Sequence, residues 1–505
     1  MKKKIWITAM AAASAAVLGA CSGGAKETAE TAQTTAAETA AESAAAEETG
    51  AQAQGEIGSV TVEEIRDKEI QLIDVRSEEQ YIGWKTAEGE GGHMEGAVDF
   101  PESWLSMDLE KESAIGTTME LELERRGLDR SKETVLYGNG TVSEETAKKY
   151  QELGFEDLSV LEGGYEAYLE DGGEAVSLPG YQMYVSPQWV QDLADGKNPE
   201  SYDGNDFQIV EVSLASETEE YGKGHLPGAV NVNADAINHV PGLRALADYE
   251  VVPMEEQLKF WNRPSDEEIQ KTLEGLGITK DTTVVLYGTT AATTAAARAG
   301  LIMKYAGVED IRLVNGGKTL WALEGREWDT EIHQPEAAEF RAEVPQNPDV
   351  IYDYEEELAA VNNENAVIAS IRSWEEYLGN ISGYTYIGEA GDIAKSRFGY
   401  AGSDPYSMED FRNVDNTMFN YEMMEDRWER WGITPDKEVV FHCGTGWRAS
   451  ETYFYAQAMG WENIHVYDGG WYEWHKQPES PVKEKGLPED APEQKPEEFF
   501  VVKKK

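Results

Sequence analysis

The feature of this 505-residue chain that most constrains its fold is a sequence unit that occurs three times. In each copy, a turn-like segment beginning with Gly precedes a short apolar run that ends at one fixed position. The three stretches are 127–138, 277–288 and 432–443. The fixed position is Gly138, Gly288 and Cys443 in turn, with spacings of 150 and 155 residues. Three units of roughly 150 residues each match the usual size of a domain.

Two further segments recur in the same order around this position. A strand-like run lies upstream, and a second apolar run downstream is closed by a Gly-Gly pair. The upstream runs are 72–76, 209–213 and 367–372, and the Gly-Gly pairs are 163–164, 316–317 and 469–470. Short apolar runs that alternate with helical stretches are typical of parallel βαβ units. We therefore predict an α/β fold of three tandem domains, each with a central parallel sheet and helices on both faces.

The repeat and the composition together divide the chain into six predicted parts. These are a signal peptide (1–20), a tether (21–56), unit one (57–182), unit two (183–340), unit three (345–487) and a tail (488–505). The tether is rich in Ala, Thr and Glu, and from residue 25 onward it lacks aromatic and branched aliphatic residues, so it cannot bury a core. Unit two carries a long insertion, 241–264, which we expect to cover or link domains.

The N-terminus predicts export and a lipid anchor. Three lysines precede the apolar stretch 5–18, which is too short to span a bilayer. The stretch ends in Leu18-Gly19-Ala20-Cys21, which resembles the lipobox of bacterial lipoproteins and implies a diacylated Cys21. We therefore expect an exported protein anchored to the outer face of the cell membrane or in the bacterial envelope. The alternative is an ordinary secretion signal with an incidental cysteine.

The formal net charge of −53 excludes two classes of partner for the folded part. A chain this acidic repels the phosphates of nucleic acids and anionic lipid headgroups. We expect no nucleic acid partner and contact with the membrane only through the lipid. The same charge means that an anionic substrate needs a local cationic pocket.

The cysteine count singles out one thiol. The chain has two cysteines, Cys21 and Cys443, so a lipid on Cys21 leaves no disulfide and a lone thiol at Cys443. This thiol lies where a predicted strand ends and a helix begins. In parallel α/β sheets, ligands bind outside the carboxyl ends of the strands. The sequence thus places its free thiol at the expected functional edge.

Several short motifs carry a family resemblance. Asp74-Val75-Arg76 in unit one, the Gly-His motifs at 92–97 and 224–229, the Gly-Gly-aromatic endings and the loop led by Cys443 together resemble rhodanese domains. The arrangement of a signal, two units without the cysteine and a third with it resembles the three-domain sulfurtransferases of bacterial envelopes, of the thiosulfate sulfurtransferase type. The resemblance covers residues 57–485. It implies three rhodanese-like domains and sulfur-transfer activity.

The loop at Cys443 is the candidate active site. Its six residues are Cys443, Gly444, Thr445, Gly446, Trp447 and Arg448. Glycines allow successive backbone N–H groups to turn inward, and the following helix adds its positive end. Both effects favour the thiolate over the thiol and would lower the thiol pKa from its usual ~8.5. The family resemblance implies a persulfide on Cys443, loaded by a donor such as thiosulfate and discharged to a thiol, cyanide or a protein persulfide acceptor. We expect no metal ion and no cofactor.

The roles of the loop residues are less tightly specified than the loop itself. Arg448 is placed to fix an anionic donor. The alternative interpretation of Cys443 is a buried side chain that is chemically inert. The Gly-rich loop, and the Gly at the same position of both sister units, disfavour it. Trp447 either shapes an acceptor site or caps the loop.

Four residues near the loop are softer candidates. Arg372 follows the first strand of unit three and either lines the pocket or forms an ion pair. Arg397 lies where the other units have their Gly-His motif and is either a local positive charge or solvated surface. His442 precedes the thiol, and in a strand its side chain points to the other face, which favours a structural role over that of a base. Ser370 replaces an aspartate of unit one.

Two rival functions remain. The first rival is a rhodanese-fold phosphatase, whose active-site loop resembles the pattern Cys-x5-Arg. Here the loop from Cys443 to Arg448 has the pattern Cys-x4-Arg, and this smaller ring suits a sulfur atom better than a phosphate. The second rival is a non-enzymatic, lipid-anchored binding or scaffold protein, because units one and two lack the nucleophile. For those two units, a scaffold or docking role is the more consistent interpretation.

Overall fold

The computed structural model describes residues 57–493, with gaps at 67, 215–217, 241–251 and 290–293, and also residue 496. The signal peptide, Cys21, the tether, the end of the tail and the first part of the unit-two insertion lie outside the described residues. Within the described ranges, every helix falls short of the length or the apolarity that a membrane-spanning segment needs.

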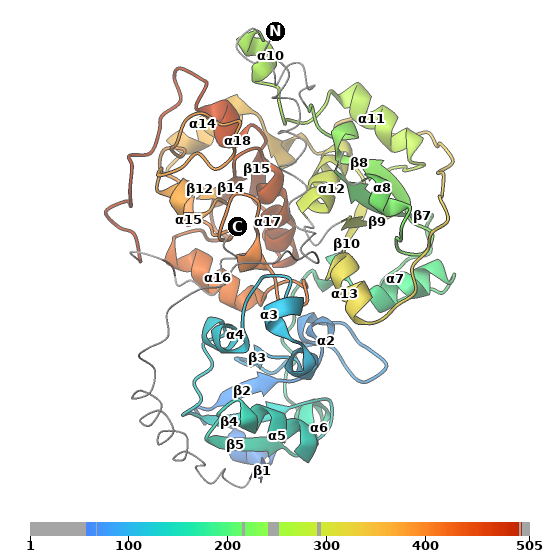
Figure 1. The fold of residues 1–505 in the computed structure, drawn as a ribbon, viewed down its shortest axis with the longest axis vertical. Helices are drawn as coiled ribbons and strands as arrows, with labels where there is room; N and C mark the ends of the chain where they lie inside the picture. The colour runs from blue at the N-terminus through green and yellow to red at the C-terminus, as the bar shows by residue number, and fades with distance from the viewer. Residues whose placement is uncertain are drawn as a thin grey trace, which may run out of the picture.

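Each unit contains its own five-stranded parallel sheet, and the strand order is the same in all three (Figure 1). The orders are β1-β5-β4-β2-β3, β6-β10-β9-β7-β8 and β11-β15-β14-β12-β13. The strands of unit one are β1 (Gly58–Val60), β2 (Gln71–Asp74), β3 (Val98–Asp99), β4 (Glu133–Tyr137) and β5 (Asp157–Leu161). Those of unit two are β6 (Tyr184–Val185), β7 (Phe207–Ser213), β8 (Val230–Asn233), β9 (Thr283–Gly288) and β10 (Asp310–Val314). Those of unit three are β11 (Ile351–Tyr352), β12 (Ala366–Ser370), β13 (Arg397–Phe398), β14 (Glu438–His442) and β15 (Ile464–Tyr467).

Helices connect the strands, as right-handed parallel crossovers require. In unit one they are α1 (Val62–Ile65), α2 (Glu78–Ile82), α3 (Leu109–Glu112), α4 (Met119–Arg125), α5 (Glu144–Glu152) and α6 (Gly164–Glu170). In unit two they are α7 (Pro187–Ala194), α8 (Thr218–Tyr221), α10 (Met254–Gln257), α11 (Asp266–Gly275), α12 (Thr294–Ala306) and α13 (Gly317–Leu323). In unit three they are α14 (Tyr354–Asn362), α15 (Trp374–Tyr377), α16 (Tyr421–Arg430), α17 (Trp447–Ala458) and α18 (Gly470–Trp474). The predicted α/β fold of three tandem domains is confirmed.

The central strands read as continuous apolar runs because both of their faces are buried. In unit three, β14 lies between β12 and β15, with Val439 opposite Val367 and Phe441 opposite Val466. All four side chains are buried. The sheet therefore holds the end of β14, where Cys443 follows, in the middle of a rigid layer.

Units two and three share one hydrophobic core, to which Tyr81, Ile82 and Trp84 of unit one contribute, and most of unit one is packed in two further clusters. Helices α12 and α17, which follow the fixed position of the repeat in units two and three, pack against each other near the centre of the molecule (Figure 1). Unit one lies below them and contacts the segment before α16. There, the indole N–H of Trp104 donates to the carboxylate of Asp415 over 2.7 Å.

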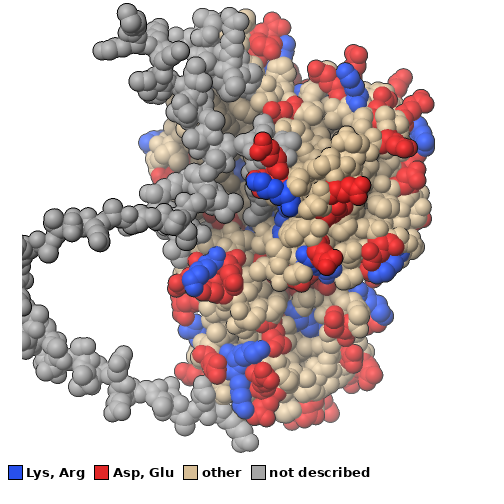
Figure 2. All heavy atoms as spheres, turned by 45° about the vertical axis from the view of Figure 1, so that its right-hand side comes forward, with Lys and Arg blue, Asp and Glu red and all other residues tan. Residues whose placement is uncertain are grey.

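The acidic composition is visible on the surface. On the face drawn in Figure 2, Asp and Glu side chains are spread over all of the described surface, with fewer Lys and Arg side chains among them. The charge is therefore distributed and does not form one acidic patch on this face. A dispersed charge of this kind favours solubility and carries no information about the fold.

Candidate active site

Cys443 lies directly after β14 and four residues before α17, at the carboxyl end of the central strand of unit three. Its side chain is fully buried, and it is a free thiol. This is the edge of the sheet where α/β proteins bind their ligands. The predicted position of the thiol, between a strand and a helix, is as expected from the sequence.

The first turn of helix α18 packs against the Cys443 loop (residues 443–448). The backbone N–H of Trp471 donates to the carbonyl of Cys443 over 2.8 Å, and the next N–H along α18 donates to the next carbonyl of the loop over 2.9 Å. A Cβ at Gly470 would lie 2.7 Å from the carbonyl oxygen of Cys443, and Gly470 has φ 51°. A trans peptide directs its C=O and N–H oppositely, so the matching loop N–H groups point away from α18. That orientation keeps these N–H groups out of the contact with α18, so that they can donate to an anion on the other side of the loop.

The loop turns into α17 at Gly446, which has φ 78°. A Cβ there would lie 2.8 Å from the carbonyl oxygen of Asp468 and 3.4 Å from Nη1 of Arg298. Arg298 comes from α12 of unit two and forms a fully buried ion pair with Asp468 over 2.5 Å. Its Nη1 atom has no hydrogen-bond partner among the described residues. Unit two therefore supplies a buried positive charge beside the loop of unit three.

Arg448 closes the loop and is held by a buried carboxylate. Its Nη1 and Nη2 atoms each donate to one oxygen of Glu376 over 3.1 Å. Arg372 donates to the same carboxylate through Nε over 3.2 Å. Burial raises the pKa of Glu376, but the guanidinium groups of Arg448 and Arg372 more than offset it, so that this pKa falls to about 2. The carboxylate stays ionised and fixes Arg448 at the end of the loop.

A second group of buried polar side chains, Asp392, Ser370 and His442, lies at the ends of β12 and β14. The carboxylate of Asp392 accepts a hydrogen bond from Ser370 Oγ over 2.7 Å and lies 3.3 Å from Nε2 of His442. Burial lowers the pKa of His442 to about 4, and the nearby Asp392 only partly opposes this effect. His442 is therefore neutral near pH 7. Its Nδ1 atom lies 3.4 Å from the carbonyl oxygen of Cys443, whereas Nε2 has no hydrogen-bond partner among the described residues. Ser370 stands where unit one has Asp74, and Asp392 supplies a carboxylate beside it.

Aromatic side chains cover the loop, and we call Trp261, Tyr384, Tyr386 and Tyr406 the aromatic cover. A Cβ at Gly444 would lie 2.2 Å from the ring of Tyr384, so this ring rests directly on the loop backbone. The ring centroids of Tyr384 lie 5.2 Å from those of Tyr386 and 5.1 Å from those of Tyr406. Trp261 stacks on Tyr386 over 4.9 Å. Burial raises the pKa of Tyr384 and of Tyr386 above that of free tyrosine, so both remain neutral phenols.

Three separate matches decide the family. The model described as "Rhodanese-like domain" matches residues 60–171, 186–324 and 354–477, which is more than half of the chain. The chain belongs to the rhodanese family. Each match falls on one of the three units and spans most of its sheet, so the rhodanese resemblance stated from the short motifs is confirmed for all three units.

Relatives of this rhodanese transfer or carry sulfur. Thiosulfate sulfurtransferase YnjE of Escherichia coli K12 is 35% identical over 427 residues, covering 84% of this chain and 91% of that protein. Sulfur carrier protein TtuD of Thermus thermophilus is 30% identical and covers 58% of this chain and 93% of its own. The predicted enzyme class, a sulfurtransferase, is confirmed.

Solved structures of a sulfur-transferring enzyme have the same fold. The anaerobic ergothioneine biosynthesis enzyme of Chlorobium limicola, solved with trimethyl histidine, is 33% identical with a TM-score of 0.76, and covers 86% of this chain and all of that one. One structure of EanB, with the same identity and TM-score, has ergothioneine covalently linked to a cysteine persulfide. A three-unit rhodanese fold therefore supports persulfide chemistry in at least one relative.

Unit one of this rhodanese keeps the helix-to-loop contact of the site without the thiol. In unit one, the N–H of Tyr165 donates to the carbonyl of Gly138 over 2.9 Å, and a Cβ at Gly164 would lie 2.6 Å from the same oxygen. Beneath this loop, Arg76 and Asp74 form a buried ion pair over 2.6 Å. The contact between helix and loop thus recurs in unit one, and unit three adds the nucleophile.

Of the remaining predicted residues, Thr445 and Trp447 lie in the loop or at its end, and Arg397 lies away from the network of Arg448. Thr445 is buried within the loop, and Trp447 is the first residue of α17 and packs against the shared core. Among the hydrogen bonds and ion pairs of the described residues, those of Arg397 go to Asp490, over 2.8 and 2.6 Å. The structure therefore joins Arg372 and Arg448 in one network and directs Arg397 toward the segment after unit three.

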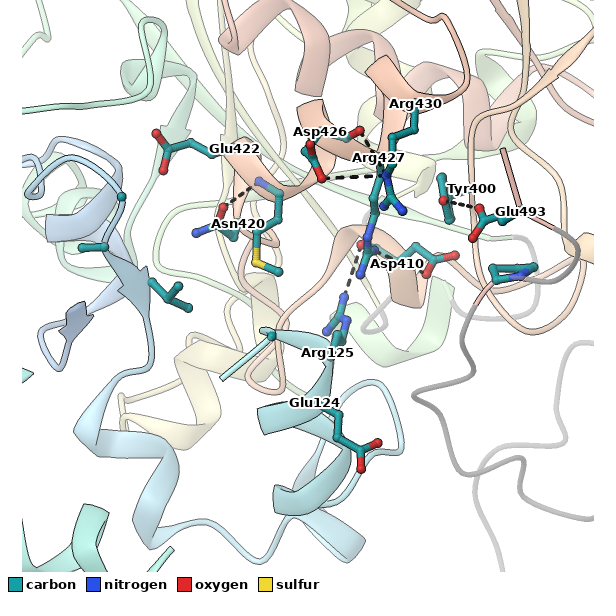
Figure 3. Close-up of a pocket in the computed structure, with 16 residues that line it drawn as sticks. Glu124, Arg125, Tyr400, Asp410, Asn420, Glu422, Asp426, Arg427, Arg430 and Glu493 are labelled. Atoms are coloured by element: carbon teal, nitrogen blue, oxygen red, sulfur yellow. Dashed lines mark hydrogen bonds and ion pairs between the residues drawn. The ribbon is translucent and has the colours of Figure 1, made fainter. Parts of the chain in front are cut away.

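A cavity of about 680 Å³ lies between unit one and unit three (Figure 3), and its lining includes none of the six loop residues. Five acidic and three basic side chains line it. Arg125 donates to the carbonyl of Asp410 over 3.2 Å, and Arg427 lies 3.8 Å from the carboxylate of the same residue. This lining lacks the positive excess that an anionic sulfur donor needs, so the cavity is not the site of the thiol chemistry.

Sequence reasoning missed the groups that complete the site. Glu376 and Asp392 carry the buried charge network, and Arg298 reaches the loop from another unit. The insertion in unit two was expected to cover or link domains, and its described part does so through Trp261. One signal was available for Glu376, because Ser373 and Glu376 form a Ser-x-x-Glu capping box directly after Arg372.

Proposed function

We propose that this sulfurtransferase carries sulfane sulfur as a persulfide on Cys443, from thiosulfate or a similar donor to a thiophilic acceptor. The observation that carries the proposal is the loop itself. A single free thiol lies at the carboxyl end of the central strand, inside a backbone turn whose N–H groups face away from α18. Arg448 and Arg298 lie beside it, each in a buried ion pair, with Glu376 and Asp468 respectively, and Nη1 of Arg298 has no hydrogen-bond partner among the described residues.

The proposed reaction has two balanced half-reactions. The thiolate of Cys443 attacks the outer sulfur of thiosulfate, the S–S bond of the donor breaks, and sulfite leaves with the electron pair. The product is a persulfide anion, Cys443-S-S⁻, held by the loop N–H groups. An acceptor such as cyanide or a thiolate then attacks the outer sulfur and releases the Cys443 thiolate. The thiol is fully buried, so the donor reaches it only when the aromatic cover moves aside.

The structure supports sulfur transfer over phosphate chemistry. In a phosphatase loop the terminal arginine binds the phosphate, whereas Arg448 gives both of its terminal nitrogens to Glu376. The loop is also one residue shorter than the Cys-x5-Arg pattern. A sulfur atom needs less room than a tetrahedral oxyanion, which fits this smaller ring.

Intact-mass spectrometry of the purified chain after thiosulfate treatment tests the proposal. We expect an adduct of one sulfur atom on the wild type, its loss on addition of cyanide with formation of thiocyanate, and no adduct on Cys443→Ser. Hydrolysis of an aryl phosphate without thiocyanate formation would favour the phosphatase instead. An adduct that persists in Cys443→Ser, or no adduct with any donor in a panel of thiosulfate, polysulfide and mercaptopyruvate, would favour the scaffold.

The aromatic cover favours a second candidate for the acceptor. Faces of Tyr and Trp rings attract quaternary ammonium groups, and four such side chains gather over the loop. The similar enzyme of Chlorobium limicola binds trimethyl histidine. Adding trimethyl histidine to the persulfide-loaded protein tests this candidate. Loss of the adduct with formation of a thiolated product supports it, and an unchanged adduct that cyanide still discharges excludes it.

We also propose that Cys21 carries lipid and anchors the exported protein to the membrane. The support is the sequence alone: three lysines, a short apolar stretch and the Leu-Gly-Ala-Cys pattern. Metabolic labelling with an alkyne fatty acid provides the test. We expect label and membrane fractionation for the wild type and neither for Cys21→Ala. Equal fractionation of the two would instead indicate an ordinary secretion signal.

A further inference from the structure

Unit two contains a cluster of three side chains that suits a metal ion. The cluster consists of His225, Asp329 and His333, whose nearest ligand atoms all lie within 4.8 Å of one another. His225 belongs to the Gly-His motif of unit two, and the other two residues follow its last helix, α13. They lie in a different unit from Cys443. The cluster has no part in the proposed sulfur chemistry.

The backbone fixes two of the three residues opposite each other. His225 and Asp329 form an antiparallel bridge in which each N–H donates to the other's carbonyl over 2.9 Å. Asp329 is further held because its carboxylate accepts the N–H of Glu331 over 2.8 Å and that of Gly228 over 3.1 Å. The turn at Glu331 then returns the chain so that His333 lies four residues on and faces the same carboxylate. The arrangement is therefore preorganised.

The tautomer of His225 leaves an unused lone pair inside the cluster. Nδ1 of His225 lies 2.8 Å from the carbonyl oxygen of Tyr221, so Nδ1 carries the proton. In the neutral ring Nε2 is then an acceptor, and it lies in a fully buried side chain and has no hydrogen-bond partner among the described residues. It faces the carboxylate of Asp329 at 3.8 Å. Two acceptors that face each other without a proton between them are stabilised by a cation.

The ligand chemistry identifies the kind of cation. We propose that His225 Nε2, His333 Nε2 and one carboxylate oxygen of Asp329 bind a divalent transition metal ion, with Zn²⁺ as the best match. Two imidazoles and one carboxylate form a common Zn²⁺ ligand set, and hard ions such as Mg²⁺ prefer oxygen ligands. A metal-bound histidine usually donates its other ring nitrogen to a carbonyl, as His225 does to Tyr221.

The coordination is open to solvent on one side. The side chains of Asp329 and His333 are 22% and 31% exposed, whereas that of His225 is fully buried. Water completes the fourth position of the tetrahedron from that side. His333 Nε2 donates to the carboxylate of Asp329 over 2.7 Å. A bound ion would replace this hydrogen bond by two metal–ligand bonds. The ion ties the chain segment after α13 to the body of unit two.

The Gly-His motif of unit one provides a natural comparison. His93 makes the same Nδ1 contact, with the carbonyl of Tyr81 over 2.9 Å, and its ring is also fully buried. Its Nε2 atom faces a single carboxylate, that of Glu422, at 3.3 Å. Among the described residues, the three-ligand cluster occurs in unit two and not around His93. The shared motif alone therefore does not make the site; His333 does.

Zinc titration of the full chain in a Cys443→Ser background tests the proposal, because this background removes the competing thiolate. Isothermal titration with Zn²⁺ in excess Mg²⁺, which saturates carboxylate-only sites, is expected to show one tight site. His333→Ala and Asp329→Asn should each weaken it by at least about tenfold, the smaller end of the losses seen for residues around metal sites. Circular dichroism checks that both variants fold.

The matched control is His239→Gln, because His239 forms a single exposed histidine–carboxylate pair with Glu256 over 3.0 Å. This variant should bind Zn²⁺ as the parent does. A Co²⁺ titration adds a signature, namely the strong visible bands of four-coordinate cobalt, present in the parent and the control and absent in His333→Ala. Equal Zn²⁺ affinity in the parent and both ligand variants, or no tight site in the parent, would overturn the proposal.

Discussion

Units one and three share the contact between helix and loop at the fixed position of the repeat, but the charged groups near it differ. In both, a Gly-Gly pair brings a helix onto the loop through hydrogen bonds to the loop carbonyls. Under the loop of unit one lies one ion pair, Asp74 with Arg76, whereas unit three places Glu376 between two arginines. The equivalent sheet positions pair Asp74 with Tyr137 and Ser370 with His442.

The difference separates what the fold provides from what the chemistry needs. The contact between a helix start and the loop carbonyls recurs in unit one, where no thiol is present, so it follows from packing a helix start against a strand end. The second guanidinium, Arg448, occurs where the thiol is, and Glu376 holds it in place. We infer that the buried carboxylate is retained in unit three to position this charge. The predictions below test that division.

The largest expected effect comes from Glu376→Gln. The change leaves Arg372 and Arg448 buried side by side without their shared charge, and breaking a buried pair costs about 3–5 kcal/mol of the free energy of unfolding. Glu375→Gln is the matched control, because it removes the same charge from the exposed neighbour. Urea denaturation at pH 7 measures both. An equal, small loss for the two variants would show that the buried network does not stabilise unit three.

The pKa of Glu376 adds a pH signature to this comparison. Its folded pKa, about 2, lies below the usual 4.5, so its stabilising contribution is present above about pH 4.5 and is lost as the pH falls toward 2. The stability difference between the wild type and Glu376→Gln should therefore shrink on acidification.

Gly470→Ala and Gly164→Ala compare the same contact in units three and one. The new Cβ would lie 2.7 Å from the carbonyl oxygen of Cys443 in the first, and 2.6 Å from that of Gly138 in the second. A shift of about 1 Å at a reacting group costs on the order of 100-fold in rate. We expect such a loss of thiosulfate–cyanide activity in Gly470→Ala and unchanged kcat in Gly164→Ala. Equal losses in both would show that unit one takes part in turnover.

Glu473 is an acid at a position that is Ala167 in unit one and Leu320 in unit two. It lies between Tyr467 Oη, at 3.2 Å, and Asn262 Nδ2, at 3.5 Å. Burial raises its pKa to about 7, above the usual 4.5. A raised folded pKa means that stability is present at low pH and is lost as the pH rises, here between about 4.5 and 7.

The measurement for Glu473 is the free energy of unfolding as a function of pH. Linkage gives a fall of about 2 kcal/mol between about pH 5 and pH 7 from this group. In Glu473→Gln that part of the slope should disappear. A slope that is the same in the two proteins would mean that the carboxylate of Glu473 is ionised in the folded state, with the ordinary pKa of an exposed acid.

The sequence predicted the fold and the thiol because both depend on local, repeated patterns. Apolar runs, Gly-Gly pairs and the Cys443 loop lie within short stretches that occur three times, so each copy supports the others. Glu376 and Arg298 could not be placed in the same way, since their contacts with the loop join residues far apart in the chain. The aromatic cover comes from the insertion in unit two and from segments of unit three whose motifs do not repeat, which removes the comparison on which the prediction relied.

The smallest expected effect is that of Arg397→Ala, and it sharpens the contrast between buried and exposed arginines. The side chains of Arg397 and Asp490 are 29% and 65% exposed, and such pairs contribute about 0–1 kcal/mol. We expect that loss in urea denaturation and an unchanged KM for thiosulfate. A KM raised tenfold or more, with stability intact, would instead place this charge on the donor's route to Cys443. Arg397 would then provide positive potential for the sulfur donor in unit three. Units one and two do not need this charge, because they have no thiol that a donor must reach.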